Sequence, residues 1–311
     1  MLLTYNIFLV VISAFLLWFG ANWVVESAAA IARRFNLSEL VIGLTIVALG
    51  TSLPEFLVTA TAAFKGLGDI SLSNIVGSNI FNLGLILGLM ALIKPVPTGR
   101  TLVYRDALLL WGVTILVLFM AFDLHMGRLS GIILMSILVG YILLILLRYG
   151  KIAEQAELPP QRTARWFDWP LLVLGFLCVA AGGHWMVEGA SSLARMAGVS
   201  EWVIGVTIVA AGTSLPEMIT CLTASLKGRN EMLLGNLVGS DFFNFAGVLG
   251  LTCIMRPLEV SPSALSSLYT LVGMVFLVLV FMRTGWRVSR LEGVMLLGLN
   301  FFRWGVDFIG G

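Results

Sequence analysis

The stretch GLTIVALGTSLPE, which runs from Gly43 to Glu55, occurs again as GVTIVAAGTSLPE from Gly205 to Glu217. A second pair lies the same 162 residues apart, with SNIVGSNIFN at 73–82 and GNLVGSDFFN at 235–244. These are the polar segments of a very apolar chain, and each first segment places a glutamate inside a hydrophobic run. The duplication predicts two structural repeats, each of which contributes one half of a functional site.

Composition indicates a membrane protein. Of the 311 residues, 59% are hydrophobic and only 12% are charged, and the mean hydropathy is +1.00, whereas about a quarter of the residues in a soluble domain are charged. Continuous apolar runs of helical length recur, so the predicted class is an all-α membrane protein. Strands are not expected, because a barrel needs short alternating segments. The net charge of +2 gives no indication of a nucleic-acid partner.

Hydropathy predicts ten transmembrane helices arranged as two inverted five-helix repeats. The first repeat is expected at 1–148 and the second at 168–311, and the hydrophilic stretch 149–167 is interpreted as a cytoplasmic linker. The ten spans are expected at 4–32, 39–65, 70–93, 104–122, 128–148, 168–195, 201–227, 230–255, 263–282 and 289–309.

The orientation follows from the span count and from the basic residues. Five spans per repeat is an odd number, so the two repeats must have opposite orientations. Most lysines and arginines lie on one side of the membrane if both termini are outside, which is the predicted topology of this multi-pass protein of the cell membrane. The stretch Gly20–Glu39 recurs at Gly182–Glu201, so the first hydrophobic segment is interpreted as a helix of the repeat and not as a signal peptide.

The GTSLPE motif predicts a broken helix with cation ligands. A proline inside a helix removes a hydrogen bond and clashes with the preceding turn, so breaks are expected at Thr51–Pro54 and Thr213–Pro216. Carbonyls freed at a break, the hydroxyls of Ser52 and Ser214 and the carboxylates that follow are oxygen ligands of the kind that Ca²⁺ and Na⁺ prefer. No cofactor is expected. The pattern is typical of a cation transporter.

The second motif is interpreted as the facing wall of this site. Gly77 and Gly239 are expected to weaken their helices. The residues four apart, Ser78 with Asn82 and Ser240 with Asn244, share a helix face. Structural alternatives remain open at this stage: the glycines can serve packing, the hydroxyls can cap helix ends, and the asparagines can bond between helices.

Together the paired motifs resemble the α-repeats of the cation/Ca²⁺ exchanger superfamily, in particular its prokaryotic Na⁺/Ca²⁺ exchanger branch. The resemblance covers nearly the whole chain, with motif regions at 43–95 and 205–257. It implies a secondary active antiporter that exchanges Na⁺ for Ca²⁺ at one midplane carboxylate site. It also implies alternating access, in which the first and sixth helices slide across the other eight. It implies that the protein lies in the lipid bilayer, and it implies no obligatory protein partner.

The resemblance implies oxygen ligands for one Ca²⁺ site and several Na⁺ sites at the midplane. The central ligands would be Glu55, Glu217, Asn82, Asn244 and the carbonyls of Thr51 and Thr213. Two flanking Na⁺ sites would use Ser52, Ser78 and the Ala48 carbonyl, and Ser214, Ser240 and the Ala210 carbonyl.

One position departs from the repeat, because Asp241 stands where Asn79 predicts an asparagine. Asp241 is interpreted either as an additional carboxylate of the ion site or as a cap of a broken helix. Branches of the superfamily that carry K⁺ tend to have an acid at the position of Asn244, so its amide favours K⁺ independence, although Asp241 weakens that argument.

Three other functions are weighed against Na⁺/Ca²⁺ exchange. A Ca²⁺/H⁺ antiporter of the same superfamily would typically have acids in the second motif of both halves. An ion channel usually repeats its filter around a central axis and does not invert it. An enzyme is not expected, because no Ser/His or paired-Asp arrangement is present.

Overall fold

The computed structural model describes residues 2–149, 163–199 and 210–310. The predicted linker and the start of the predicted span 201–227 therefore fall mainly outside the described residues. The elements of the first part are α1 (Leu2–Arg34), α2 (Glu39–Ile42), η1 (Gly43–Val47), α3 (Ala48–Thr51), α4 (Leu53–Phe64), α5 (Gly68–Ile80), η2 (Phe81–Ile86), α6 (Leu87–Ile93), β1 (Val96–Pro97), η3 (Leu102–Ala107), α7 (Leu108–Met120), β2 (His125–Met126) and α8 (Arg128–Tyr149).

The second part of the chain repeats this order. Its elements are α9 (Asp168–Met196), α11 (Ala210–Gly212), α12 (Leu215–Leu226), α13 (Asn230–Phe242), η6 (Phe243–Leu249), α14 (Gly250–Met255), β3 (Leu258–Glu259), α15 (Pro262–Arg283), η7 (Thr284–Trp286), β4 (Arg287–Val288) and α16 (Arg290–Gly310). The segments η1, η2, η3 and η6 are π-helical.

The all-helical membrane class is confirmed. Within the described residues, seven helices are long and apolar enough to cross a bilayer, or eight if Glu39–Phe64 counts as one broken span. The count of ten stays a prediction. Strands were not expected, yet four two-residue strands are present outside the apolar helices, where they join connecting segments.

The chain divides into two compact units, and each of them combines segments from both halves of the sequence. The first unit contains Met1–Pro54 and Leu144–Asn236, and the second contains Glu55–Leu143 and Leu237–Gly311. The second unit holds both strand pairs. In these, β1 pairs with β4 and β2 pairs with β3, both antiparallel. Because β3 is the repeat counterpart of β1 and β4 that of β2, the two pairings are equivalent, as a twofold relation requires.

Backbone conformation also repeats along the chain. Six of the seven left-handed φ angles of the described residues occur in repeat-related pairs: 52° at Asn36 and 80° at Gly198, 76° at Gly66 and 71° at Gly228, and 56° at Leu124 and 54° at Trp286. The first pair ends α1 and α9, where a left-handed residue is a common helix terminator. Equivalent positions thus end equivalent helices, even where one copy has glycine and the other does not.

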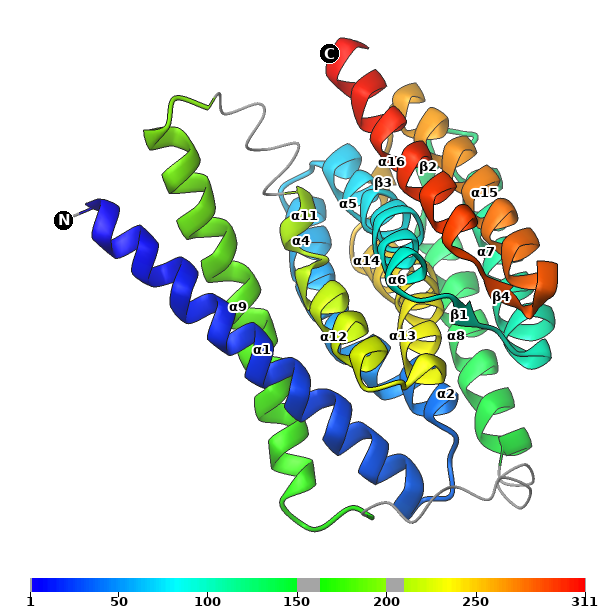
Figure 1. The fold of residues 1–311 in the computed structure, drawn as a ribbon. Helices are drawn as coiled ribbons and strands as arrows, with labels where there is room; N and C mark the ends of the chain where they lie inside the picture. Colours follow the sequence, from blue (N-terminus) through cyan, green and yellow to red (C-terminus); the bar gives the residue numbers. More distant parts are fainter. Residues whose placement is uncertain (1, 150–162, 200–209, 311) are drawn as a thin grey trace. The chain divides into compact units, whose positions relative to one another are not determined.

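In the first unit, α1 packs along α9 (Figure 1) through small residues. A Cβ atom on Gly20 would lie 2.9 Å from the Gly175 carbonyl oxygen, and one on Gly182 would lie 3.1 Å from the Ser13 carbonyl oxygen. The two contacts are repeat counterparts. Glycine at these positions lets the two backbones approach closely, which is the usual way in which helices associate in a membrane.

We expect Gly20→Ala to destabilise the protein. The added methyl group would lie 2.8 Å from Val179 Cγ2 and 2.9 Å from Cys178 Cβ, and such overpacking costs about 1–3 kcal/mol, which exceeds the ~1 kcal/mol that alanine gains over glycine in a helix. Thermal unfolding of the detergent-solubilised protein measures the loss. Gly140→Ala in α8 is the matched control, because its Cβ meets nothing within 4 Å. Equal melting temperatures for the two variants would contradict the packing argument.

Candidate ion site

The helix breaks expected at the two LPE motifs are confirmed. Only Ser52 separates α3 from α4, and Thr213 and Ser214 separate α11 from α12. Ser52 and Ser214 have nearly the same backbone angles, with φ −82°, ψ 3° and φ −90°, ψ 6°. These angles belong to the sparsely populated bridge region, where many site residues are found. Since Pro54 and Pro216 have no N–H group, the α-helical hydrogen bond to the residue four positions earlier cannot form.

In the first unit, polar side chains gather around the second of these breaks. Glu217, in the first turn of α12, is completely buried, and Ser52 Oγ lies 3.5 Å from its Oε1 atom. Thr51 Oγ1 lies 3.2 Å from Asn236 Oδ1, and Asn236 Nδ2 lies 3.3 Å from Cys221 Sγ. A carboxylate, two hydroxyls and an amide are therefore held together without exposure to solvent.

Asn236 was not among the predicted ligands. Its side chain links helices instead, since it joins α13 to α3 and α12. The Ala48 carbonyl, an implied Na⁺ ligand, accepts the N–H of Ser52 at 3.0 Å. A carbonyl oxygen has a second lone pair, and Thr51 Oγ1 lies 3.3 Å from the Ala48 carbonyl oxygen.

In the second unit, four buried residues form a chain of hydrogen bonds between α5–η2 and α13–η6. Asn82 Nδ2 donates to Asp241 Oδ1 at 2.9 Å, and Asn244 Nδ2 donates to Asn79 Oδ1 at 2.9 Å. These two bonds are repeat counterparts. One further bond distinguishes the two halves of the network, because Asn79 Nδ2 also donates to the Asp241 carbonyl at 3.2 Å, a bond that an aspartate side chain cannot return. None of the four is more than 1% exposed.

The amide oxygens of Asn82 and Asn244 have no hydrogen-bond donor among the described residues, although both are buried. A buried polar atom without a partner costs about 1–3 kcal/mol and calls for an explanation. Because each amide nitrogen is fixed by the bond it donates, each amide oxygen is left with its lone pairs directed at another partner. A cation is such a partner, and the predicted ligand role of both residues has this physical support.

The expectation that Gly77 and Gly239 weaken their helices is not met, since α5 and α13 remain α-helical through both glycines. The irregularity lies a turn later, where η2 and η6 begin at Phe81 and Phe243 and contain the two asparagines. A π-helical segment redirects the side chains that it carries and is frequent at functional sites. The cap role for Asp241 is wrong for the same reason, because Asp241 lies inside a continuous helix and its carboxylate accepts from Asn82.

The predicted site residues are thus distributed over both units. The first unit carries Ala48, Thr51, Ser52, Ala210, Thr213, Ser214 and Glu217, and the second carries Glu55, Ser78, Asn82, Ser240, Asp241 and Asn244. Glu55, Ser78 and Ser240 are buried. The backbone carbonyl of Glu55 accepts from Asn74 Nδ2 at 3.4 Å, and Asn74 also donates to Thr59 Oγ1 at 3.0 Å.

Asn79 is the residue that sequence reasoning missed. Its signal was its position, since it is the repeat counterpart of Asp241 and lies three residues before Asn82. Among the described residues, no three of His, Cys, Asp and Glu converge as a metal cluster. The acids there are accompanied by hydroxyl and amide oxygens, a ligand chemistry that suits hard cations and not soft metals.

Known proteins match nearly the whole chain. The profile of the family described as "Sodium/calcium exchanger protein" matches residues 5–147 and 167–302. Inner membrane protein YrbG of Escherichia coli is 33% identical, and the match covers 95% of this chain and 94% of that protein. Sodium/calcium exchanger MaX1 of Methanosarcina acetivorans is 29% identical, with 95% and 96% covered.

The fold agrees with solved structures. The sodium-calcium exchanger NCX_Mj, soaked with zero Na⁺ and Ca²⁺, superposes with a TM-score of 0.83 at 31% identity, over 96% of this chain and 97% of the other. The same exchanger soaked with Na⁺ and Sr²⁺ gives 0.84, with 96% of both chains covered. The match to this family of transporters supports Ca²⁺ antiport. This chain is a multi-pass integral membrane protein of the sodium/calcium exchanger family.

Proposed function

We propose that the chain exchanges Na⁺ for Ca²⁺ across the membrane by alternating access. The observation that carries the proposal is the set of buried oxygens in the two units: the carboxylates of Glu217 and Glu55, and the unbonded amide oxygens of Asn82 and Asn244. Charge at the centre of a bilayer costs about 2.5 kcal/mol or more per residue. Buried acids in both repeats are therefore expected only where a cation compensates them.

The proposed mechanism is competition between the two ions. One Ca²⁺, or two or more Na⁺ assisted by hydroxyl and amide oxygens, neutralises the two glutamates. The sequence repeat predicts that both carboxylates serve one site, so that either ion displaces the other. Without an ion, the buried charges remain uncompensated, and we expect the protein to resist switching in that state. This resistance would suppress uncoupled leak.

The proposed moving part is the pair α1 and α9. Their contact through Gly20 and Gly182 is close and repeats with the sequence, which supports movement as one body. The proposed topology has ten transmembrane helices in two inverted repeats, with both termini outside. Labelling of single cysteines added at residues 2 and 310 in intact cells tests the topology. Labelling of either one only after permeabilisation would contradict it.

Asp241 favours one alternative, Ca²⁺/H⁺ antiport, because a buried carboxylate next to Asn82 can carry a proton. The hydroxyls and amides at the equivalent positions Ser78, Ser240, Asn82 and Asn244 favour Na⁺ as the coupling ion, since none of them binds a proton near neutral pH.

Radioactive Ca²⁺ uptake into proteoliposomes tests the proposal. Vesicles are loaded with Na⁺ and diluted into Na⁺-free choline buffer, and a matched set carries a proton gradient without Na⁺. We expect uptake only with the Na⁺ gradient, and the same rate with or without K⁺. Uptake driven by protons alone would replace the proposal by the H⁺-coupled alternative. Vesicles without protein give the background, and absence of uptake in both sets would refute Ca²⁺ antiport.

A further inference from the structure

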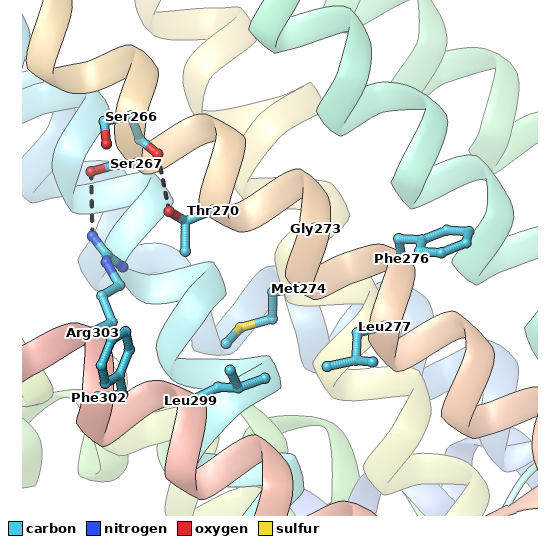
Figure 2. Close-up of a pocket in the computed structure, with 10 residues that line it drawn as sticks. All are labelled: Ser266, Ser267, Thr270, Gly273, Met274, Phe276, Leu277, Leu299, Phe302 and Arg303. Carbon is cyan, nitrogen blue, oxygen red and sulfur yellow. Dashed lines mark hydrogen bonds between the residues drawn. The ribbon is translucent and has the colours of Figure 1, made fainter.

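A groove of about 520 Å³ lies between α15 and α16 in the second unit, within the ~300–1,000 Å³ of small-molecule sites. One end is polar (Figure 2). There Arg303 donates to Ser267 Oγ at 3.4 Å, and Thr270 Oγ1 donates to the Ser266 carbonyl at 3.0 Å. The Arg303–Ser267 bond is long, and both groups can donate to the same incoming oxygen.

The other end of the groove is apolar. Met274, Leu277 and Leu299 line it, and Phe302 at its edge is 72% exposed. Gly273 forms part of its floor, and a Cβ atom there would meet nothing within 4 Å. The groove therefore has room for a hydrocarbon chain beside a glycine that leaves the space open.

The two ends lie at different depths in the membrane. The helix α15 contains a candidate membrane span, Ala264–Trp286, and its polar groove residues lie in its first three turns. Leu277 is ten residues beyond Ser267, about 15 Å along the helix axis at 1.5 Å per residue. The polar end is thus at the depth of lipid headgroups, and the apolar end reaches into the ~30 Å hydrocarbon core.

We propose that this groove binds one phospholipid of the bilayer. The phosphate accepts hydrogen bonds from Arg303 and the hydroxyl of Ser267, since arginine is a preferred partner of phosphate oxygens. An acyl chain lies along Met274, Leu277 and Leu299. A cation and hydroxyls at headgroup depth match a phosphodiester, and the described lining residues of the groove include no acid that would attract a basic protein segment.

Native mass spectrometry of the purified protein in detergent tests the proposal. Phosphatidylglycerol, phosphatidylethanolamine and a diacylglycerol with the same chains are added separately. We expect the two phospholipids to form a one-to-one complex and the diacylglycerol, which lacks the phosphate, to form none. Gly273→Phe fills the groove and Arg303→Gln removes the charge, and each should reduce the bound fraction about tenfold, a change of ~1.4 kcal/mol. Arg303→Lys should restore part of the binding.

Two variants provide matched controls. Gly140→Phe places the same ring on α8, where a Cβ also meets nothing within 4 Å, and Arg128→Gln removes an exposed arginine at the start of that helix. Both should bind phospholipid as the unchanged protein does, and circular dichroism checks that every variant is folded. Equal binding by Gly273→Phe and Gly140→Phe would overturn the proposal, as would equal binding of diacylglycerol. A dimer that only Gly273→Phe dissociates would assign the groove to a second copy of the chain. The measurement needs no ion gradient, so it is independent of the exchange activity.

Discussion

Glu217→Gln and Glu55→Gln are each expected to abolish Na⁺-driven Ca²⁺ uptake while the protein stays folded. Glutamine keeps the size of the side chain and removes its charge. Leaving a buried charge, here that of the ion, without its partner costs about 3–5 kcal/mol, which corresponds to a loss of two orders of magnitude or more in affinity. The measurement is Ca²⁺ uptake into Na⁺-loaded proteoliposomes, with melting temperature as the check of folding.

Glu259→Gln is the matched control, because Glu259 lies in β3 and is exposed. It should transport at the rate of the unchanged protein. Substantial Na⁺-driven uptake by either of the other two variants would remove that glutamate from the ion site. It would also leave the charge-competition mechanism without its main support.

The double variant tests whether the two carboxylates serve one ion, as the sequence repeat predicts. Residues that act as a unit are strongly non-additive. If one site is shared, Glu55→Gln combined with Glu217→Gln should bind Ca²⁺ no more weakly than the weaker single variant, within the error of the assay. Two independent sites would instead leave each single variant with one of two binding events, which a titration of the protein resolves.

The helix breaks at this site could be predicted from the sequence, because the prolines that cause them have strong local effects on the backbone. Pro54 and Pro216 cannot donate a backbone hydrogen bond, so the breaks follow from chemistry alone. The position of the helix irregularity in the second motif could not be predicted in this way. A glycine costs a helix only about 1 kcal/mol, and α5 and α13 continue through Gly77 and Gly239, whereas the π-helical segments at Phe81 and Phe243 have no compositional signal.

The composition of the two compact units could also not be predicted from the order of the segments in the sequence. The repeat divides the chain at its middle, but the units mix both halves, since which helices pack together depends on surfaces that are far apart in sequence. The partners of Asn82 and Asn244 illustrate this limit. Each bonds to a residue of the other repeat, and only the 162-residue spacing indicates that the two bonds are equivalent.

Asp241→Asn is expected to weaken the binding of Ca²⁺ more than the binding of Na⁺. The variant keeps an oxygen that can accept from Asn82 Nδ2, so the hydrogen bond survives, and it removes one negative charge next to a proposed ligand. Since Coulomb energy scales with the charge of the ion, a tenfold loss in Ca²⁺ affinity, ~1.4 kcal/mol, corresponds to only about a threefold loss per Na⁺. Equilibrium binding of radioactive Ca²⁺, with Na⁺ as competitor, measures both.

A charge swap separates the electrostatic role of Asp241 from its position in the network. In the double variant Asn79→Asp and Asp241→Asn, the acid moves to the counterpart position, where it can accept from Asn244 as Asp241 now accepts from Asn82. If charge near the paired amides determines the Ca²⁺ preference, the double variant should regain most of the affinity that Asp241→Asn loses. If the affinity stays low, either the charge acts only from position 241, or the bond from Asn79 to the Asp241 carbonyl, which the swap removes, is needed as well. An Asp241→Asn variant with unchanged affinities for both ions would make Asp241 a structural acceptor that holds the Asn82 amide and contributes no charge to the site.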